Sequence, residues 1–165
     1  MKICILAADG YEDQELWYPK FRFLEEGFSV VVAGDGEKKS KYGYPVTPDL
    51  KVSKLKAADF DCVIIPGGIK GSENLRMDKA VTDFVRQMHH DGKIIGSICH
   101  GAWVLISSIP VKGKKLTCYK GMKDDLIAAG ARYEGSEVVV DQNIVTSRMP
   151  SDLPAFTKTI LKKLR

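Results

Sequence analysis

The sequence lacks the long apolar runs, paired cysteines and metal-binding patterns that would direct a location or a cofactor. The apolar stretch near the start, Ile3 to Ala7, is far shorter than a membrane span of about 20 residues, and too short for a secretory signal. The four cysteines form no CxxC pair and have no metal-ligand spacing to the three histidines. We therefore expect a cytoplasmic protein with no membrane association, no disulfide, no bound metal and no other cofactor.

An excess of charge of one sign is also missing. There are 25 Lys and Arg residues against 21 Asp and Glu residues, a net charge of +4, and only the end from Lys158 to Arg165 is markedly basic. Cations favour the C-terminal end of a helix, so we expect this basic stretch to be the solvated end of a helix. No nucleic-acid partner is expected. With 165 residues, no linker and no repeat, the chain is expected to form a single catalytic domain over residues 1–165.

Short apolar runs that alternate with helical patterns predict the fold. The predicted strands are Ile3 to Ala7, Ser29 to Ala33, Cys62 to Ile65, Lys93 to Ile98, Glu137 to Val140 and Ile144 to Ser147. The predicted helices are Asp13 to Glu26, Asp78 to His90, one that begins after Ile98, Met122 to Ala129 and one that ends at Leu164. Continuous apolar strands are typical of a parallel sheet covered on both faces, so we expect an α/β three-layer sandwich. The irregular stretch from Lys38 to Lys56 is expected to form a hairpin or a lid.

Cys99 is the candidate nucleophile. It follows an apolar strand and precedes a helix, and the small residues Ser97 and Gly101 stand two positions before and after it, as in a nucleophile elbow. A helix N-terminus lowers the pKa of a thiol, and the adjacent His100 can exchange its proton. A lone buried cysteine is more often core filler, which is the role expected for Cys4, Cys62 and Cys118.

Further candidate residues lie at other predicted strand ends. The amides of Gly68 and His100 are candidates for an oxyanion hole, although Pro66-Gly67-Gly68 could equally be a simple turn. Glu12, after the first strand, and Glu73, in a predicted loop, are both candidates for a carboxyl that acts on the cysteine or on the histidine. Spacing does not choose between them.

Four separated motifs resemble the PfpI family, within the superfamily of the parkinsonism-associated deglycase and the class I glutamine amidotransferase domains. They are Ala8 to Leu16, Pro66-Gly67-Gly68, Ser97 to Gly101 and Thr146-Ser147-Arg148. The resemblance implies a flavodoxin-like fold, Cys99 as nucleophile, Glu12 as the carboxyl at its sulfur and Tyr119 as a pocket residue. It further implies a homo-oligomer, a dimer or a hexamer of dimers, in which Glu73 orients His100 of a neighbouring subunit.

Three kinds of function follow from that resemblance. The first is a deglycase or glutathione-independent glyoxalase that acts on methylglyoxal or on glycated protein adducts, and it is favoured because a small elbow pocket suits a small carbonyl substrate. The second is an intracellular cysteine peptidase, whose partner would be a peptide. The third is a redox-sensing stress protein or a chaperone, since a reactive thiol near a carboxyl is readily oxidised.

Overall fold

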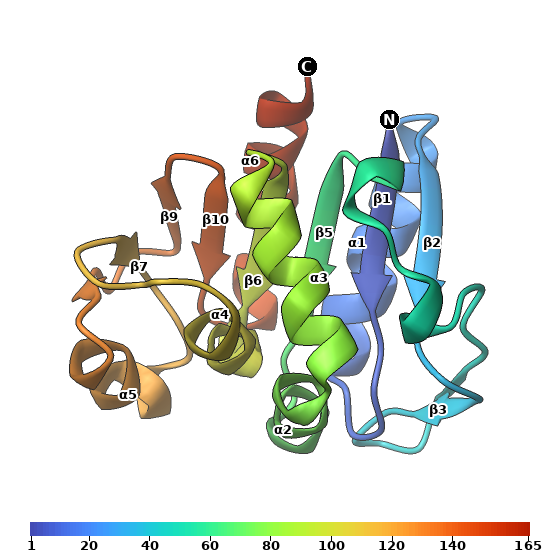
Figure 1. Ribbon diagram of the computed structural model, residues 1–165, viewed down its shortest axis with the longest axis horizontal. Coiled ribbons are helices and arrows are strands. Elements are labelled where there is room, and N and C mark those ends of the chain that lie inside the picture. Colours follow the sequence, from blue (N-terminus) through green and yellow to red (C-terminus); the bar gives the residue numbers. More distant parts are fainter.

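A six-stranded sheet forms the centre of the computed structural model, which describes residues 1–165 (Figure 1). Its strand order is β2-β1-β5-β6-β10-β9, and every neighbouring pair is parallel except β10 with β9. The strands are β1 (Lys2–Leu6), β2 (Ser29–Ala33), β5 (Cys62–Ile65), β6 (Ile94–Ile98), β9 (Val138–Asp141) and β10 (Ile144–Ser147). All six predicted strands are therefore confirmed, each end within one residue.

Helices cover both faces of this sheet (Figure 1). One face carries α1 (Asp13–Glu25) and α6 (Leu153–Leu164), and the other carries α2 (Ile69–Met77), α3 (Lys79–His90) and α4 (Ala102–Ser108). A further helix, α5 (Lys123–Ala128), lies beyond α4. The predicted three-layer α/β sandwich with a flavodoxin-like, mostly parallel sheet is thus confirmed. No helix is both long enough and apolar enough to cross a membrane.

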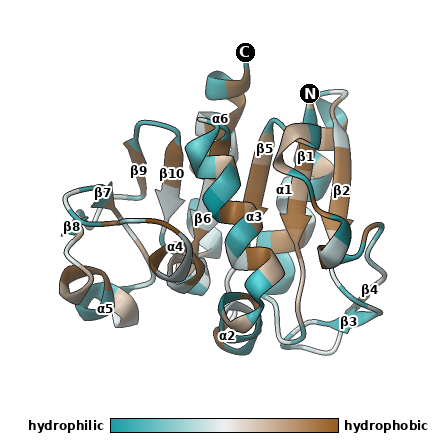
Figure 2. Ribbon diagram, in the orientation of Figure 1, coloured by the Kyte–Doolittle hydropathy of each residue, from teal (hydrophilic) through white to brown (hydrophobic).

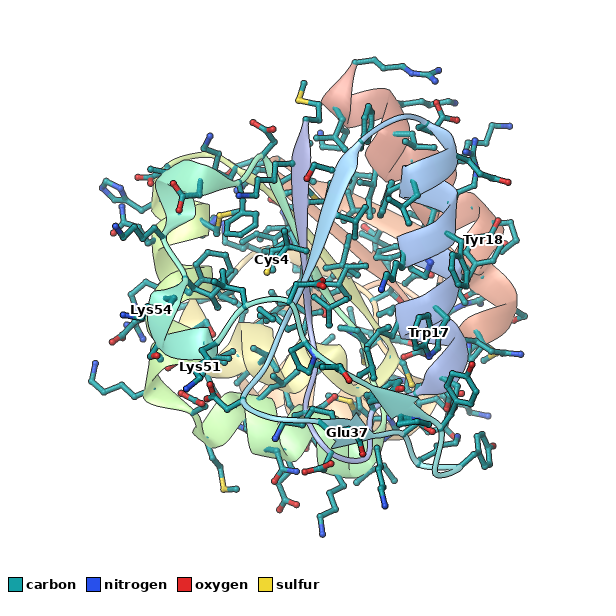
Figure 3. All side chains as sticks on the ribbon, turned by 90° about the vertical axis from the view of Figure 1, so that its right-hand side faces the viewer. Cys4, Trp17, Tyr18, Glu37, Lys51 and Lys54 are labelled. Atoms are coloured by element: carbon teal, nitrogen blue, oxygen red, sulfur yellow. The ribbon has the colours of Figure 1, made fainter.

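Two hydrophobic clusters fill the spaces between the sheet and its helices. Phe84, Val85 and Leu105 belong to the cluster under α3 and α4, whereas Phe23 and Phe156 belong to the cluster under α1 and α6. The strands β1, β2 and β5 are accordingly apolar along most of their length (Figure 2), and Cys4 lies within the sheet layer (Figure 3). Strands buried on both faces need no alternation of polar and apolar residues, which is why continuous apolar runs predict them.

The largest difference from the predicted elements is α2. The stretch around Glu73 was expected to be a loop, but it lies inside a nine-residue helix. Gly71 and Ser72 are poor helix formers, so the sequence pattern is weak there. Gly71, Ser72 and Leu75 are buried in the fold, so tertiary packing stabilises the helix.

Small strand pairs complete the fold at its periphery. Residues of β3 (Lys38–Lys39) and β4 (Pro45–Val46) form an antiparallel pair, so the irregular stretch contains the expected hairpin. A parallel pair joins β7 (Lys115–Leu116) and β8 (Arg132–Tyr133). The β3 and β4 hairpin lies near the carboxyl ends of the parallel strands, beside the start of α1 (Figure 1).

Candidate active site

Cys99 occupies a tight turn between β6 and α4. Its φ is 59°, and Gln142 is the only other residue besides glycine with a positive φ. A side chain at Gly101 would approach the carbonyl oxygen of Ile65 to 2.6 Å, so the position two residues after the cysteine must be small. This is the geometry of the predicted elbow, and a non-glycine residue held in such a conformation is typical of a functional site.

The predicted donors and the predicted histidine surround the sulfur. The Sγ atom of Cys99 lies 3.2 Å from Nδ1 of His100. Burial raises the pKa of Cys99, a nearby carboxylate raises it further, and hydrogen bonds from the backbone N–H groups of His100 and Gly68 oppose both effects. The two amides expected to form an oxyanion hole therefore converge on the sulfur of Cys99.

The carboxyl beside the sulfur belongs to Glu15, and the expectation that Glu12 occupies this place is wrong. Glu15 is completely buried, its Oε2 accepts a 2.7 Å hydrogen bond from the amide of Gly67, and it is the carboxyl within hydrogen-bonding reach of Cys99. Burial is the main cause that raises the pKa of Glu15 to about 8. A carboxyl that keeps its proton at neutral pH can donate that proton to a thiolate.

The helical phase of α1 explains why Glu15, and not Glu12, lies beside the sulfur of Cys99. The buried face of α1 is formed by Glu15, Leu16, Pro19 and Phe23, whereas Glu12 precedes the helix. Glu12 forms a 2.5 Å ion pair with Lys41 of the hairpin instead. A signal in the sequence could have identified Glu15. This residue stands four residues before Pro19 and eight before Phe23, on a helical stripe that is otherwise apolar.

Aromatic rings hold the imidazole of His100. The ring of Tyr119 stacks on it at 4.8 Å between centroids, and Trp103 contacts it edge-on at 5.3 Å. Burial lowers the pKa of His100, Lys41 lowers it further, and Asp125 opposes them. His100 is therefore neutral at physiological pH and can accept a proton.

Glu73 is not part of this cluster within one chain. It lies on α2 with an exposed side chain and is absent from the groups that influence the pKa of His100. Arg148 is also elsewhere, because its guanidinium forms a 2.8 Å ion pair with Asp152 and donates a 2.9 Å hydrogen bond to the carbonyl of Gly135. Arg148 thus ties the end of β10 to the start of α6.

A cleft of about 1110 Å³ opens above Cys99. Its walls include Glu12, Gly68, His100 and Tyr119, together with residues 39–42 of the hairpin. Cys99 itself is 8% exposed. The cleft lies where parallel strands end, the usual place for ligands in an α/β sheet.

The remaining three cysteines lie in the core, away from the cleft. Cys4, Cys62 and Cys118 are fully buried, and burial raises the pKa of each thiol. No group of three or more His, Cys, Asp and Glu side chains is arranged to hold a metal ion. Cys99 is thus the one cysteine that lines the cleft.

Comparison with known proteins gives a consistent result. The chain is 41% identical to a deglycase of Pyrococcus horikoshii over the full length of both, and 41% identical to a candidate cysteine protease of Bacillus subtilis over 99% of this chain and 98% of that one. A solved two-domain protein of Anabaena variabilis, with DJ-1/ThiJ/PfpI-like and ferritin-like domains, superposes with a TM-score of 0.95 at 35% identity, over 99% of this chain and 48% of that one. A sequence model described as the DJ-1/PfpI family matches residues 1–163. The chain belongs to the DJ-1/PfpI family.

Proposed function

We propose that this protein is a cysteine-dependent deglycase and glutathione-independent glyoxalase, acting on methylglyoxal and on its adducts with proteins through one catalytic domain. The observation that carries the proposal is the elbow cysteine, whose sulfur is faced by two backbone amides, the imidazole of His100 and the protonated carboxyl of Glu15. The deglycase from Pyrococcus horikoshii, similar over its full length, supports the same class of reaction.

The first step is addition of the Cys99 thiolate to the aldehyde carbon of methylglyoxal. A carbon–sulfur bond forms, and the π electron pair of the carbonyl moves to its oxygen, which is stabilised by the N–H groups of Gly68 and His100. Glu15 stabilises the attacking thiolate by donating a hydrogen bond and can then protonate the oxyanion. The product of this step is a hemithioacetal on Cys99.

The second step rearranges the hemithioacetal and releases the acid. Neutral His100 takes the proton from the carbon bonded to sulfur, the hydroxyl proton on that carbon moves to the oxygen of the neighbouring carbon, and a proton is returned to the neighbouring carbon itself, which leaves a lactoyl thioester. Water cleaves this thioester, so the overall change is methylglyoxal plus water to lactate. An amine or guanidine adduct would reach the same thioester after the nitrogen departs, and the repaired side chain would be released.

A cysteine peptidase is the second candidate function. The cleft of about 1110 Å³ is far larger than methylglyoxal, so it offers room for a peptide as well as for a glycated side chain. The relative from Bacillus subtilis supports this alternative. Peptide cleavage would use the same thiolate and oxyanion donors, but it requires His100 to protonate the leaving amine.

Glu73 would complete the site from a second copy of the chain. Ile69, Glu73 and Met77 follow one another at intervals of four residues along α2, and the two apolar side chains are 62% and 70% exposed. A carboxylate between two exposed apolar residues suits an interface between subunits. In such an oligomer Glu73 would orient the imidazole of His100.

One assay panel tests the proposed activity. The purified protein should produce lactate from methylglyoxal and release the adduct from methylglyoxal-treated arginine, whereas Cys99→Ala should abolish both. Glu15→Gln should lower kcat/KM by about 10²-fold or more, the usual range for loss of general acid catalysis. Glu25→Gln, on the exposed face of the same helix, is the matched control and should retain activity. Full activity of Cys99→Ala would reject the proposal, and cleavage of peptides alone would favour the peptidase.

A further inference from the structure

Hydrogen bonds within one chain do little to fix the orientation of the His100 imidazole. The Sγ atom of Cys99, 3.2 Å from Nδ1, is the only hydrogen-bond partner of this ring. The outer torsion of a histidine side chain has a broad energy profile, so a half turn that replaces Nδ1 by a carbon atom meets little resistance by itself. The orientation that turns the nitrogen toward the sulfur therefore depends on the groups packed against the ring.

Two aromatic rings make these contacts. Tyr119 stacks on the imidazole with an angle of 26° between the planes, and Trp103 meets it at 66°. The amide of Tyr119 donates to the carbonyl of Cys99 at 3.3 Å, so this ring is tied to the elbow itself. Trp103 follows His100 by three residues, and helical spacing places the two side chains next to each other. The orientation of the imidazole thus depends on where the indole is held.

Charged residues from two other helices hold the indole of Trp103. Its Nε1 donates a 2.8 Å hydrogen bond to Oδ2 of Asp125, in the first turn of α5. The guanidinium carbon of Arg76, on α2, lies 5.8 Å from the centre of the ring, and Nε of Arg76 donates to Oγ of Ser107 at 3.0 Å. Trp103 also borders a surface cleft of about 490 Å³, so core packing does not enclose the ring. The hydrogen bond to Asp125 is therefore the directional contact that fixes it.

We propose that Asp125 and Trp103 are positioning residues of the active site, in which the Asp125 carboxylate fixes the indole and the indole keeps Nδ1 of His100 turned toward the sulfur. Neither residue lines the cleft above Cys99, so both act through His100 and not on the substrate. Asp125 raises the pKa of His100, which agrees with a carboxylate close to that ring. The inference rests on the proposed function, in which His100 accepts a proton.

Turnover of methylglyoxal gives the first test. Asp125→Ala should lower kcat by about 3- to 10-fold, the value of one hydrogen bond, and change KM by less than about twofold. Asp125→Asn keeps an oxygen that can accept from the indole, so it should retain most of kcat. Asp124→Ala removes the same charge from the same turn of α5, where Asp124 is exposed, and is the matched control that should behave as the parent. A contact that only docks α5 on α4 would change the free energy of unfolding in Asp125→Ala and leave kcat intact.

A double-mutant cycle tests whether the two residues act as one unit. Trp103→Phe keeps an aromatic ring but lacks the indole N–H, so it should lower kcat by a factor similar to that of Asp125→Ala. Adding Asp125→Ala to Trp103→Phe should cause no further loss, because no N–H remains for the carboxylate to hold. Additive losses, or an equal loss in Asp125→Asn and Asp125→Ala, would overturn the inference.

Nitrogen NMR of the His100 ring tests the orientation without any substrate. His100→Gln identifies the resonances, and Nδ1 should shift in Asp125→Ala and in Trp103→Phe but not in Asp124→Ala. Such shifts in a protein that is inert toward methylglyoxal would support the positioning role and reject the proposed activity. Lactate formation with an unchanged Nδ1 resonance and an unchanged kcat in Asp125→Ala would support the activity and reject the positioning role.

Discussion

Glu15 lies on the buried face of α1, where its neighbours Leu16, Pro19 and Phe23 pack toward the sheet. One carboxylate oxygen accepts a hydrogen bond from Gly67, whereas the other, Oε1, has no hydrogen-bond partner other than the nearby sulfur. Such a carboxyl weakens the core that it occupies. A proton retained at neutral pH is the chemical benefit, and reduced stability is its physical cost.

That cost should depend on pH, and Glu15→Gln should reveal it. Below about pH 4.5 the folded and unfolded chains both hold the proton, so the carboxyl adds no penalty. As the pH rises through the ordinary 4.5 toward about 8, only the unfolded chain releases its proton, and the free energy of unfolding falls. Glu15→Gln, which is neutral throughout, should therefore gain stability over the parent, about 2–5 kcal/mol at pH 8 and little at pH 4.

Urea unfolding at pH 4.5, 6 and 8 measures this difference directly. Glu25→Gln removes an exposed carboxylate from the same helix and should change the free energy of unfolding by less than about 1 kcal/mol at each pH. An advantage of Glu15→Gln that is equal at all three pH values would show that the carboxyl is not protonated in the folded state.

The turn between β5 and α2 connects the elements that build the site. Gly68 has a φ of 87° and caps the N-terminus of α2. A Cβ atom at this position would overlap the carbonyl oxygen of Gly10 and lie 2.8 Å from the amide of Glu12. The turn is therefore pressed against the start of α1, and only glycine permits both the backbone conformation and the close approach.

Gly68→Ala should be much more damaging than the same change at Gly36. Gly36 has a φ of 70°, but an added methyl group there would meet no atom within 4 Å, so Gly36→Ala should cost only the conformational strain of about 1–2 kcal/mol. Gly68→Ala adds backbone displacement, which should raise the cost well above that value and lower kcat/KM by moving an oxyanion donor. Urea unfolding and methylglyoxal turnover measure the two effects. Equal losses of stability at the two positions would contradict the close approach.

The whole molecule presents a face along α2 whose composition is unusual for a solvent-exposed helix. Ile69 and Met77 are exposed on either side of Glu73, while Leu75 on the opposite side of the helix is buried. An aromatic group, formed by Trp17, Phe21 and Tyr44, lies in the layer of α1 on the other face of the sheet. Trp17 and Tyr18 extend there from α1 (Figure 3). The two surfaces belong to different layers. Glu73, the carboxylate expected to reach a second copy, lies on the α2 face.

Met77→Lys should therefore produce monomers and lower activity together. A buried lysine opposite an apolar surface destabilises an interface, so light scattering coupled to size exclusion should report a smaller mass. Met77→Leu is the conservative control and should keep both mass and activity. Glu73→Gln should keep the mass but lower turnover. A monomeric Met77→Lys protein with full activity would refute a site shared between subunits.

Much of the fold was predictable because its strands are buried on both faces. Ser29–Ala33 and Cys62–Ile65 end where the apolar runs end. The elbow was also predictable, since a cysteine between two small residues at the junction of such a strand with a helix has the spacing that a tight turn requires. Helix α2 was not, because Gly71 and Ser72 hide its pattern until their burial is known.

The sequence by itself determined the alternation of the six main strands with helices and indicated the elbow at Cys99, but it left open whether Pro66-Gly67-Gly68 supplies an oxyanion donor or is a simple turn. Only the tertiary structure decided which carboxyl serves the sulfur of Cys99. Glu12 and Glu15 stand three residues apart in one motif, but α1 turns Glu15 into the core and leaves Glu12 to pair with Lys41. The physical reason is that the proton affinity of a carboxyl depends on its burial and on its neighbours, and both follow from the packing of distant segments.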